Sequence, residues 1–226
     1  MKENEFRDFG ITKKDDGVFI IKGKGLLFFN KNVSKLEELE LIFSNIQKID
    51  GSIKYLSNIL MIDLGFNKLT LLPDNFSDNF TSLKELNLSG NQLKKLSDNF
   101  STNPKSLEKS YFMGNKFTSL PKDFSTGLKN LKTVSLSSNE FKKLPDSFSL
   151  GFTNLKIFGL AGNQLTTLPD NFSVGLKNLY LRYNSLPQNQ INKLKNKLPK
   201  NTKIEHGSGL YTYLINKLPY QQVWYN

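Results

Sequence analysis

The chain has 226 residues, of which 38% are hydrophobic and 23% charged, and its formal net charge is +11. This composition is that of a folded domain or a repeat array with its own core, and it excludes a disordered chain. Cysteine is absent and His206 is the single histidine, so disulfides, cysteine nucleophiles, thiolate metal sites and multi-histidine metal centres are excluded.

The first 35 residues predict an N-terminal cap. Residues 1–9 are acidic where a secretory signal would carry a basic and then an apolar stretch, so we expect no signal peptide and a cytoplasmic location or a non-classical secretion route. No window of about 18 apolar residues occurs in the chain, so we expect no transmembrane segment. Residues 18–21, a Gly-rich turn at 22–25 and residues 26–29 predict a β-hairpin.

An asparagine recurs at a fixed spacing through the middle of the chain. The spacing is 24 residues and finally 21, at Asn67, Asn91, Asn115, Asn139, Asn163 and Asn184. Before each asparagine, apolar residues alternate, as in Leu86-x-Leu88-x-x-Asn91, which predicts a short strand with one buried face. Because an amide both donates and accepts, the asparagines predict a buried ladder that satisfies backbone groups between units.

This frame resembles the leucine-rich repeat family, whose motif is L-x-x-L-x-L-x-x-N-x-L. The resemblance covers residues 36–186 as seven units, with a degenerate first unit around Ser44. It implies an α/β solenoid: a leucine-rich repeat horseshoe with a parallel concave β-sheet and short helical or 3₁₀ turns on the convex side, capped at both ends. Ser110 departs from the motif at an apolar position, and we expect a local packing defect there.

The second half of each unit is also regular. A phenylalanine column predicts a second core spine behind the sheet, at Phe76, Phe100, Phe124, Phe148 and Phe172. Aspartate before the phenylalanine, and Asn or Gly after it (Gly127, for example), predict a short helical turn with an N-cap and a left-handed last residue. A calcium ladder of these aspartates is the alternative, and capping is the simpler interpretation.

Residues 187–226 predict a C-terminal cap. Residues 187–198 have the apolar spacing of a short amphipathic helix that Pro199 ends, and residues 202–205 predict a final strand. The aromatic tail of residues 210–225, which includes Trp224, either packs on this cap or binds a partner. Residues 186–226 carry six lysines and one acidic residue, so basic charge is concentrated at this end.

In such a fold the residues between the buried apolar positions face the concave side. Small residues fill the middle of this face, and large ones lie at its two ends. Aromatic and arginine side chains dominate binding hot spots, so we predict a partner-binding set here. It comprises Phe43, Asp63, Phe66, Tyr111, Met113, Tyr180, Arg182 and Tyr183. The alternative is that the terminal caps fold over the exposed phenylalanines.

The sequence therefore favours a non-enzymatic, monomeric module that recognises a partner protein on the concave face. No residue is predicted to be catalytic, because His206 lacks triad partners at a recognisable spacing and no G-x-S-x-G elbow occurs. We also expect no cofactor and no metal. The Asn- and Lys-rich, Arg-poor composition resembles that of AT-rich bacteria, some of which deliver repeat proteins into host cells, and it suggests a virulence effector acting on a host protein.

A second hypothesis is binding of nucleic acid or an anionic membrane through the C-terminal cap. The lysines concerned are Lys193, Lys195, Lys197, Lys200 and Lys203. A nucleic-acid binder usually carries an arginine-rich stripe, yet Arg7 and Arg182 are the sole arginines. A solvated helix face is the simpler explanation of these lysines.

Overall fold

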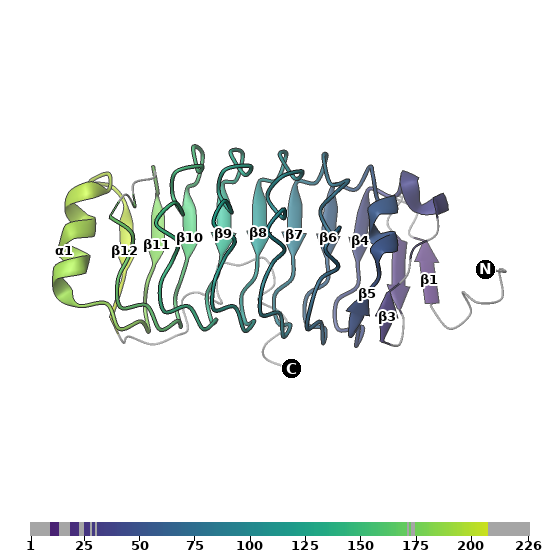
Figure 1. The fold of residues 1–226 in the computed structure, drawn as a ribbon, viewed down its shortest axis with the longest axis horizontal. Coiled ribbons are helices and arrows are strands. Elements are labelled where there is room, and N and C mark those ends of the chain that lie inside the picture. Colours follow the sequence, from purple (N-terminus) through teal and green to yellow (C-terminus); the bar gives the residue numbers. More distant parts are fainter. Residues whose placement is uncertain are drawn as a thin grey trace.

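The computed structural model describes residues 10–13, 19–22, 25–27, 29, 31–170, 172 and 175–207. These residues wind into an elongated stack of coils, each with a strand on the same side (Figure 1). The predicted aromatic tail at 210–225 lies outside the described residues, as do residues 1–9 and part of the expected Gly-rich turn.

Short strands form a ten-stranded sheet in the part of the chain that is described. In sheet order they are β1 (Gly10–Lys13), β2 (Phe19–Lys22), β4 (Glu38–Glu40), β6 (Met61–Asp63), β7 (Glu85–Asn87), β8 (Lys109–Tyr111), β9 (Thr133–Ser135), β10 (Ile157–Gly159), β11 (Asn178–Tyr180) and β12 (Lys203–Glu205). The first pair is antiparallel and each later neighbouring pair is parallel. The predicted solenoid with a parallel sheet is confirmed.

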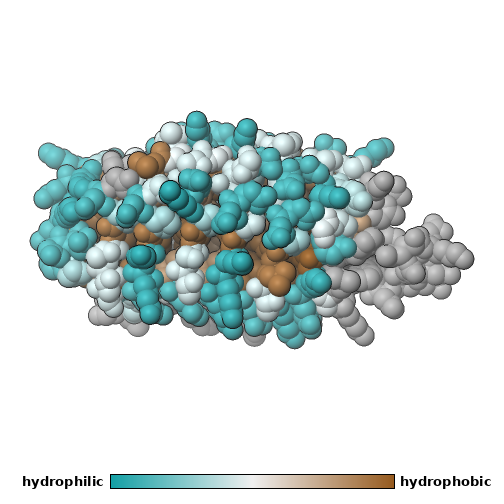
Figure 2. Space-filling view, in the orientation of Figure 1, coloured by the Kyte–Doolittle hydropathy of each residue, from teal (hydrophilic) through white to brown (hydrophobic). Residues whose placement is uncertain are grey.

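The core lies between the sheet and the convex segments. The central residue of each repeat strand is buried, and the phenylalanine column packs behind it. Ring centroids of Phe100 and Phe124, and of Phe124 and Phe148, are 6.2 Å apart in stacked arrangements. On the face seen in Figure 2, hydrophobic residues form a recessed band along the molecule, bordered by hydrophilic side chains. The second core spine is thus present.

The asparagine ladder joins each repeat to the preceding one. Asn91 Nδ2 donates to the Leu88 carbonyl of its own repeat at 3.1 Å and to the Leu64 carbonyl of the preceding repeat at 3.0 Å. Its Oδ1 accepts from the Leu69 N–H at 3.0 Å. The same bonds recur at Asn67, Asn115, Asn139, Asn163 and Asn184. The predicted buried ladder is confirmed.

The convex side is built mainly from tight turns. The described 3₁₀ helices are η2 (Lys31–Lys35) and η3 (Gly51–Tyr55), while later repeats use i→i−3 bonds such as Phe76 N–H to the Pro73 carbonyl at 2.9 Å. The left-handed conformation predicted for Gly127 is wrong, because its φ is not positive. A Cβ at Gly127 would lie 1.7 Å from the Ser101 carbonyl oxygen, so this glycine permits close stacking of two repeats.

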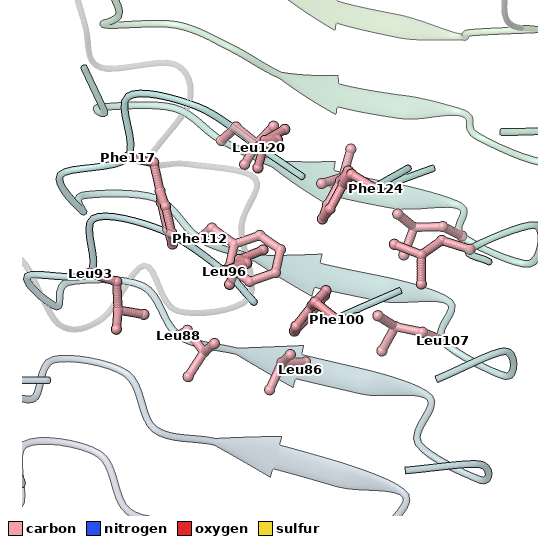
Figure 3. Packing of buried hydrophobic residues seen from close by; sticks show 14 of the residues in the cluster. Leu86, Leu88, Leu93, Leu96, Phe100, Leu107, Phe112, Phe117, Leu120 and Phe124 are labelled. Atoms are coloured by element: carbon pink, nitrogen blue, oxygen red, sulfur yellow. The ribbon is translucent and has the colours of Figure 1, made fainter. Parts of the chain in front are cut away.

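The repeat that contains Ser110 differs from its neighbours at two core positions. Ser110 is fully buried, and its hydroxyl has no hydrogen-bond partner among the described residues. Two residues later stands Phe112, in a column where the adjacent repeats have leucine. Its ring centroid lies 5.8 Å from that of Phe100 and 6.3 Å from that of Phe124 (Figure 3). This repeat therefore combines a smaller side chain at one core position with a larger ring at another, and the buried Ser110 hydroxyl stays unsatisfied.

The two ends of the array are covered differently. At the N-terminal end, residues 19–22 pair with 10–13 rather than with 26–29 as expected, and β3 (Leu26–Leu27) pairs in parallel with β5 (Lys48–Ile49). At the other end, α1 (Gln188–Lys197) buries Ile191 and Leu194, and β12 extends the sheet, so the predicted helix and final strand are confirmed. The boundaries of the regions 1–35, 36–186 and 187–226 stay a prediction.

Candidate functional site on the concave face

The strand register aligns the outward residues of successive repeats. Glu40 lies opposite Asp63, Asp63 opposite Asn87, and Asn87 opposite Tyr111. The complete column is Glu40, Asp63, Asn87, Tyr111, Ser135, Gly159, Tyr180 and Glu205. Residues that lie more than twenty positions apart in sequence are therefore neighbours on one continuous face.

Asp63, one of the predicted binding residues, belongs to the floor of this face. It is 1% exposed, and its Oδ1 accepts from the Gly65 N–H at 2.8 Å and from Asn87 Nδ2 at 2.9 Å. Asn87 repeats the arrangement, since its Oδ1 accepts from the Ser89 N–H at 3.0 Å. This Asx motif was missed in the sequence, although an Asp or Asn two residues before a small residue is its usual signal.

The two tyrosines of the column are also buried. Tyr111 is 5% exposed and Tyr180 is 7% exposed. Burial, with a smaller effect from the carboxylate of Glu85, raises the pKa of Tyr111 to about 12. The Tyr111 phenol is therefore neutral near pH 7, and both tyrosines form part of the surface of the face without projecting far from it.

The C-terminal end of the face contains paired charges. Arg182 Nε lies 3.7 Å from Glu205 Oε2, and Lys203 Nζ lies 2.9 Å from Glu205 Oε1. Glu205 is buried, so the two cations offset the cost of removing its carboxylate from water. Arg182, Tyr183 and Met113 are half-buried. These three therefore keep part of their surface exposed.

A column of left-handed residues follows the strands. Every described member has a positive φ between 53° and 67°: Phe43, Phe66, Gly90, Gly114, Ser138, Gly162 and Tyr183. The backbone N–H of one member donates to the carbonyl of the residue just before the next member, as from Phe66 to Ser89 at 2.8 Å. Glycine adopts this conformation without strain, whereas other residues pay about 1–2 kcal/mol. Gly90, Gly114 and Gly162, which share one position of the repeat, were the signal for this column in the sequence.

Phe43 and Phe66 form a stacked pair at the N-terminal end of this column. Their ring centroids are 4.8 Å apart with an interplanar angle of 19°. A Cβ at Gly90 would lie 2.5 Å from the ring of Phe66, so the missing side chain at Gly90 makes room for the pair. Phe43 remains 54% exposed.

Two carboxylates lie on β4, the strand that precedes Phe43. Glu38 and Glu40 lie on β4 next to Met61 and Asp63 of β6. Of the ion pairs between described residues, none includes Glu38 or Glu40. Farther along the sheet, Glu85 is paired with Lys109 at 3.0 Å.

The lysines of the C-terminal cap are largely engaged within the chain. Lys193 forms an ion pair with Asp170, and the resulting hydrogen bond holds the pKa of that carboxyl below its usual range. Lys197 donates to the Asp170 carbonyl, and Lys203 contacts Glu205. Among the residues described, no cluster of three or more His, Asp or Glu side chains could hold a metal ion. The same part of the chain contains no helix long and apolar enough to cross a bilayer.

Several solved structures share this fold. A leucine-rich repeat protein of Leptospira interrogans is 27% identical, with a TM-score of 0.68 over 81% of this chain and 49% of that protein. Two structures of the Drosophila Toll–Spätzle complex are 16% and 18% identical, with TM-scores of 0.60 and 0.62 over 74% and 76% of this chain and 28% of the neighbour. This chain thus spans about half or less of each neighbour's length. No curated protein matches it in sequence.

Family models give the same result independently. A leucine rich repeat model matches residues 34–93, 105–165 and 129–186, and another matches residues 82–107. These matches cover more than half of the chain and coincide with the repeats seen in the sheet. Proteins built from this repeat generally act as non-enzymatic modules for protein–protein recognition. The chain belongs to the leucine-rich repeat family.

Proposed function

We propose that the protein is a non-enzymatic recognition module that binds a partner protein on the concave face of its sheet. The observation that carries the proposal is the in-register set of outward columns, whose residues vary while the buried positions between them repeat. Parallel strands hold successive members of each column about 4.8 Å apart. Such a preformed surface loses little conformational entropy when a partner binds.

Within this surface we assign direct contact to the exposed and half-buried members of the predicted set. These are Phe43, Phe66, Met113, Arg182 and Tyr183. The buried members Asp63, Tyr111 and Tyr180 instead fix the floor on which the partner rests. One fold neighbour, Toll, is solved in a complex with the protein Spätzle, which supports a protein ligand for this architecture.

Site-specific photo-crosslinking tests the proposal. A benzoylphenylalanine placed at Met113 should capture one discrete protein at about 50 and 300 mM salt. The same group at Leu150, which is 67% exposed on the convex side, is the matched control and should not capture it. Equal capture from both positions, or capture of nothing from Met113 by a correctly folded protein, would contradict concave-face recognition.

Binding of nucleic acid or an anionic membrane through the C-terminal lysines is the alternative. Three of the five lysines already contact groups of the chain itself, which favours the protein ligand. The salt comparison separates the two functions, because binding to phosphate groups weakens steeply as salt rises. A ligand lost at 300 mM salt and lost when Lys195 and Lys200 become glutamine would support the alternative.

A narrower form of the proposal is a bacterial effector that acts on a host protein. Its support is the Asn- and Lys-rich composition and the similarity to a Leptospira interrogans repeat protein. A translocation reporter fused to the full chain tests it in infected host cells. Reporter signal confined to the bacteria would remove the host-directed role while leaving concave-face recognition intact.

A further inference from the structure

The glycines of the left-handed column show which residue the fold requires at this position of the repeat. Glycine satisfies the conformation at Gly90, Gly114 and Gly162, in the same backbone hydrogen-bonding environment. At Phe43 and Phe66 the chain places large aromatic side chains in a conformation that disfavours them. Strained residues of this kind persist where another requirement outweighs the strain.

Burial is not that requirement at Phe43. More than half of the side chain is exposed, and its described aromatic contact is the face of Phe66. The stack leaves the outer surface of Phe43 toward solvent, while Gly90 accommodates Phe66 from the other side. An aromatic ring held in this way is a preformed contact surface.

The charges near Phe43 indicate which chemical group its ring binds. The chain has a net charge of +11, and the carboxylates of Glu85, Glu108, Asp170 and Glu205 all have lysine or arginine partners. Glu38 and Glu40, on the strand that leads to Phe43, have none within the described part of the chain. A cation above an aromatic face and beside two carboxylates is favoured by both the ring quadrupole and the charges.

We propose that Phe43, stacked on Phe66 and preceded by Glu38 and Glu40 on β4, docks an arginine- or lysine-bearing segment of the partner protein. The proposal rests on concave-face recognition and adds the chemistry of the segment. Phe43 receives the cation on its exposed face. Glu38 and Glu40 are positioning residues that select a basic segment over a neutral one.

Peptide titration followed by amide NMR tests the docking chemistry on the full chain. The probes are two capped Gly-Ser peptides at constant ionic strength, one with three arginines and one with three citrullines, which keep the shape and remove the charge. The arginine peptide should shift the amides of residues 38–43 and 63–66 and bind at least about fivefold more tightly than the citrulline peptide. Equal binding of both peptides would overturn the proposal.

Variants separate the site from general acidity. Phe43→Gly should abolish the local shifts and leave the unfolding midpoint unchanged or raised, and Glu38→Gln/Glu40→Gln should remove the preference for arginine over citrulline. Ser138→Gly, in the same column, is the control and should bind like the wild type. Full binding by Phe43→Gly, or shifts centred instead on Glu108 or Asp170, would contradict the assignment.

The crosslinked partner distinguishes this inference from the proposed function. If Met113 still captures a protein whose binding is unaffected by Phe43→Gly and by the glutamine pair, docking of a basic segment is wrong and concave-face recognition stands. If the arginine peptide binds at Phe43 while Met113 and Leu150 capture protein equally, the basic site stands and recognition across the concave face is wrong.

Discussion

The asparagine ladder and the left-handed column run side by side along the same array, yet they differ in how strictly the fold dictates their residues. In the ladder, asparagine recurs at each full repeat. Its amide oxygen accepts a hydrogen bond and its amide NH₂ donates hydrogen bonds, and the partners are buried backbone groups of two neighbouring repeats. In the left-handed column, the backbone favours glycine, yet the chain uses glycine at three positions and aromatic residues at both ends.

This difference shows that a residue can be required for two reasons, one within the folded chain and one outside it. A residue in the ladder is explained by the hydrogen bonds it makes within the chain. An aromatic residue in the left-handed column has a folding cost that glycine would avoid, so its explanation lies partly outside the folded chain. Replacement of a ladder asparagine should therefore destabilise the protein, whereas replacement of a non-glycine residue of the left-handed column by glycine should leave its stability unchanged or raise it.

The largest effect is expected in the ladder. Asn115→Ala removes the acceptor of the Leu93 N–H and the donor to the Leu88 and Phe112 carbonyls, all of them buried. Stability should fall by about 3 kcal/mol, since several buried polar groups lose partners. Urea unfolding measures the loss, and Asn154→Ala, at an exposed asparagine, should change it by less than about 0.5 kcal/mol. Equal losses of stability would mean that the buried hydrogen bonds of Asn115 contribute no more than those of an exposed asparagine.

The next effect compares two glycines of the left-handed column. Gly90→Ala and Gly114→Ala introduce the same strain, of about 1 kcal/mol. Only at position 90 does the new Cβ meet a ring, that of Phe66 at 2.5 Å. Gly90→Ala should therefore destabilise by about 2 kcal/mol and Gly114→Ala by about 1 kcal/mol in thermal unfolding. Indistinguishable losses would show that Phe66 does not depend on the space at Gly90.

A smaller effect tests how far the buried core follows the repeat. Ser110→Leu should overpack the core against Phe112, and Phe112→Leu should leave a void, each at a cost of about 1–2 kcal/mol. The double variant restores the pattern of the neighbouring repeats and should lose less than the sum, with a coupling of at least about 1 kcal/mol. Additive losses in a double-mutant cycle would mean that the two positions do not compensate.

The smallest expected effect has the opposite sign. Ser138→Gly relieves a left-handed serine but adds backbone freedom to the unfolded chain, so a gain of about 0.5 kcal/mol should remain. Calorimetry on the variant and the wild type measures it. A loss larger than about 1 kcal/mol would mean that the serine side chain contributes contacts that outweigh the strain.

Much of the fold could be predicted from the sequence because its strongest signal has a fixed period. The spacing of Asn67 to Asn163 places the strands, their register and the outward columns, and all of these are seen. The N-terminal hairpin was predicted from local alternation and a Gly-rich turn. The local sequence pattern predicts that a segment is a strand but does not identify the strand with which it pairs. Here residues 26–27 pair with β5 instead.

The candidate site was predictable in position but not in exposure. The register of the repeats in the sequence places Tyr111 and Tyr180 on the concave face. Their burial depends on three-dimensional packing, which the repeat pattern does not contain. The positive φ at Phe43 and Phe66 was also not predictable from these residues alone, because bulky residues rarely adopt it. The signal was the glycine at the same position of other repeats.

The asparagine ladder also gives the array a direction. Each amide oxygen serves an N–H of the preceding repeat, as Asn184 serves Leu165 at 3.0 Å, while each amide NH₂ reaches back to a carbonyl of that repeat. Within the ladder, removal of the last unit leaves a backbone N–H without its side-chain acceptor, whereas removal of the first unit leaves an asparagine amide without part of its backbone partners. An engineered C-terminal cap should therefore present a side-chain acceptor to that N–H, and an engineered N-terminal cap should present a backbone N–H and a carbonyl to the amide.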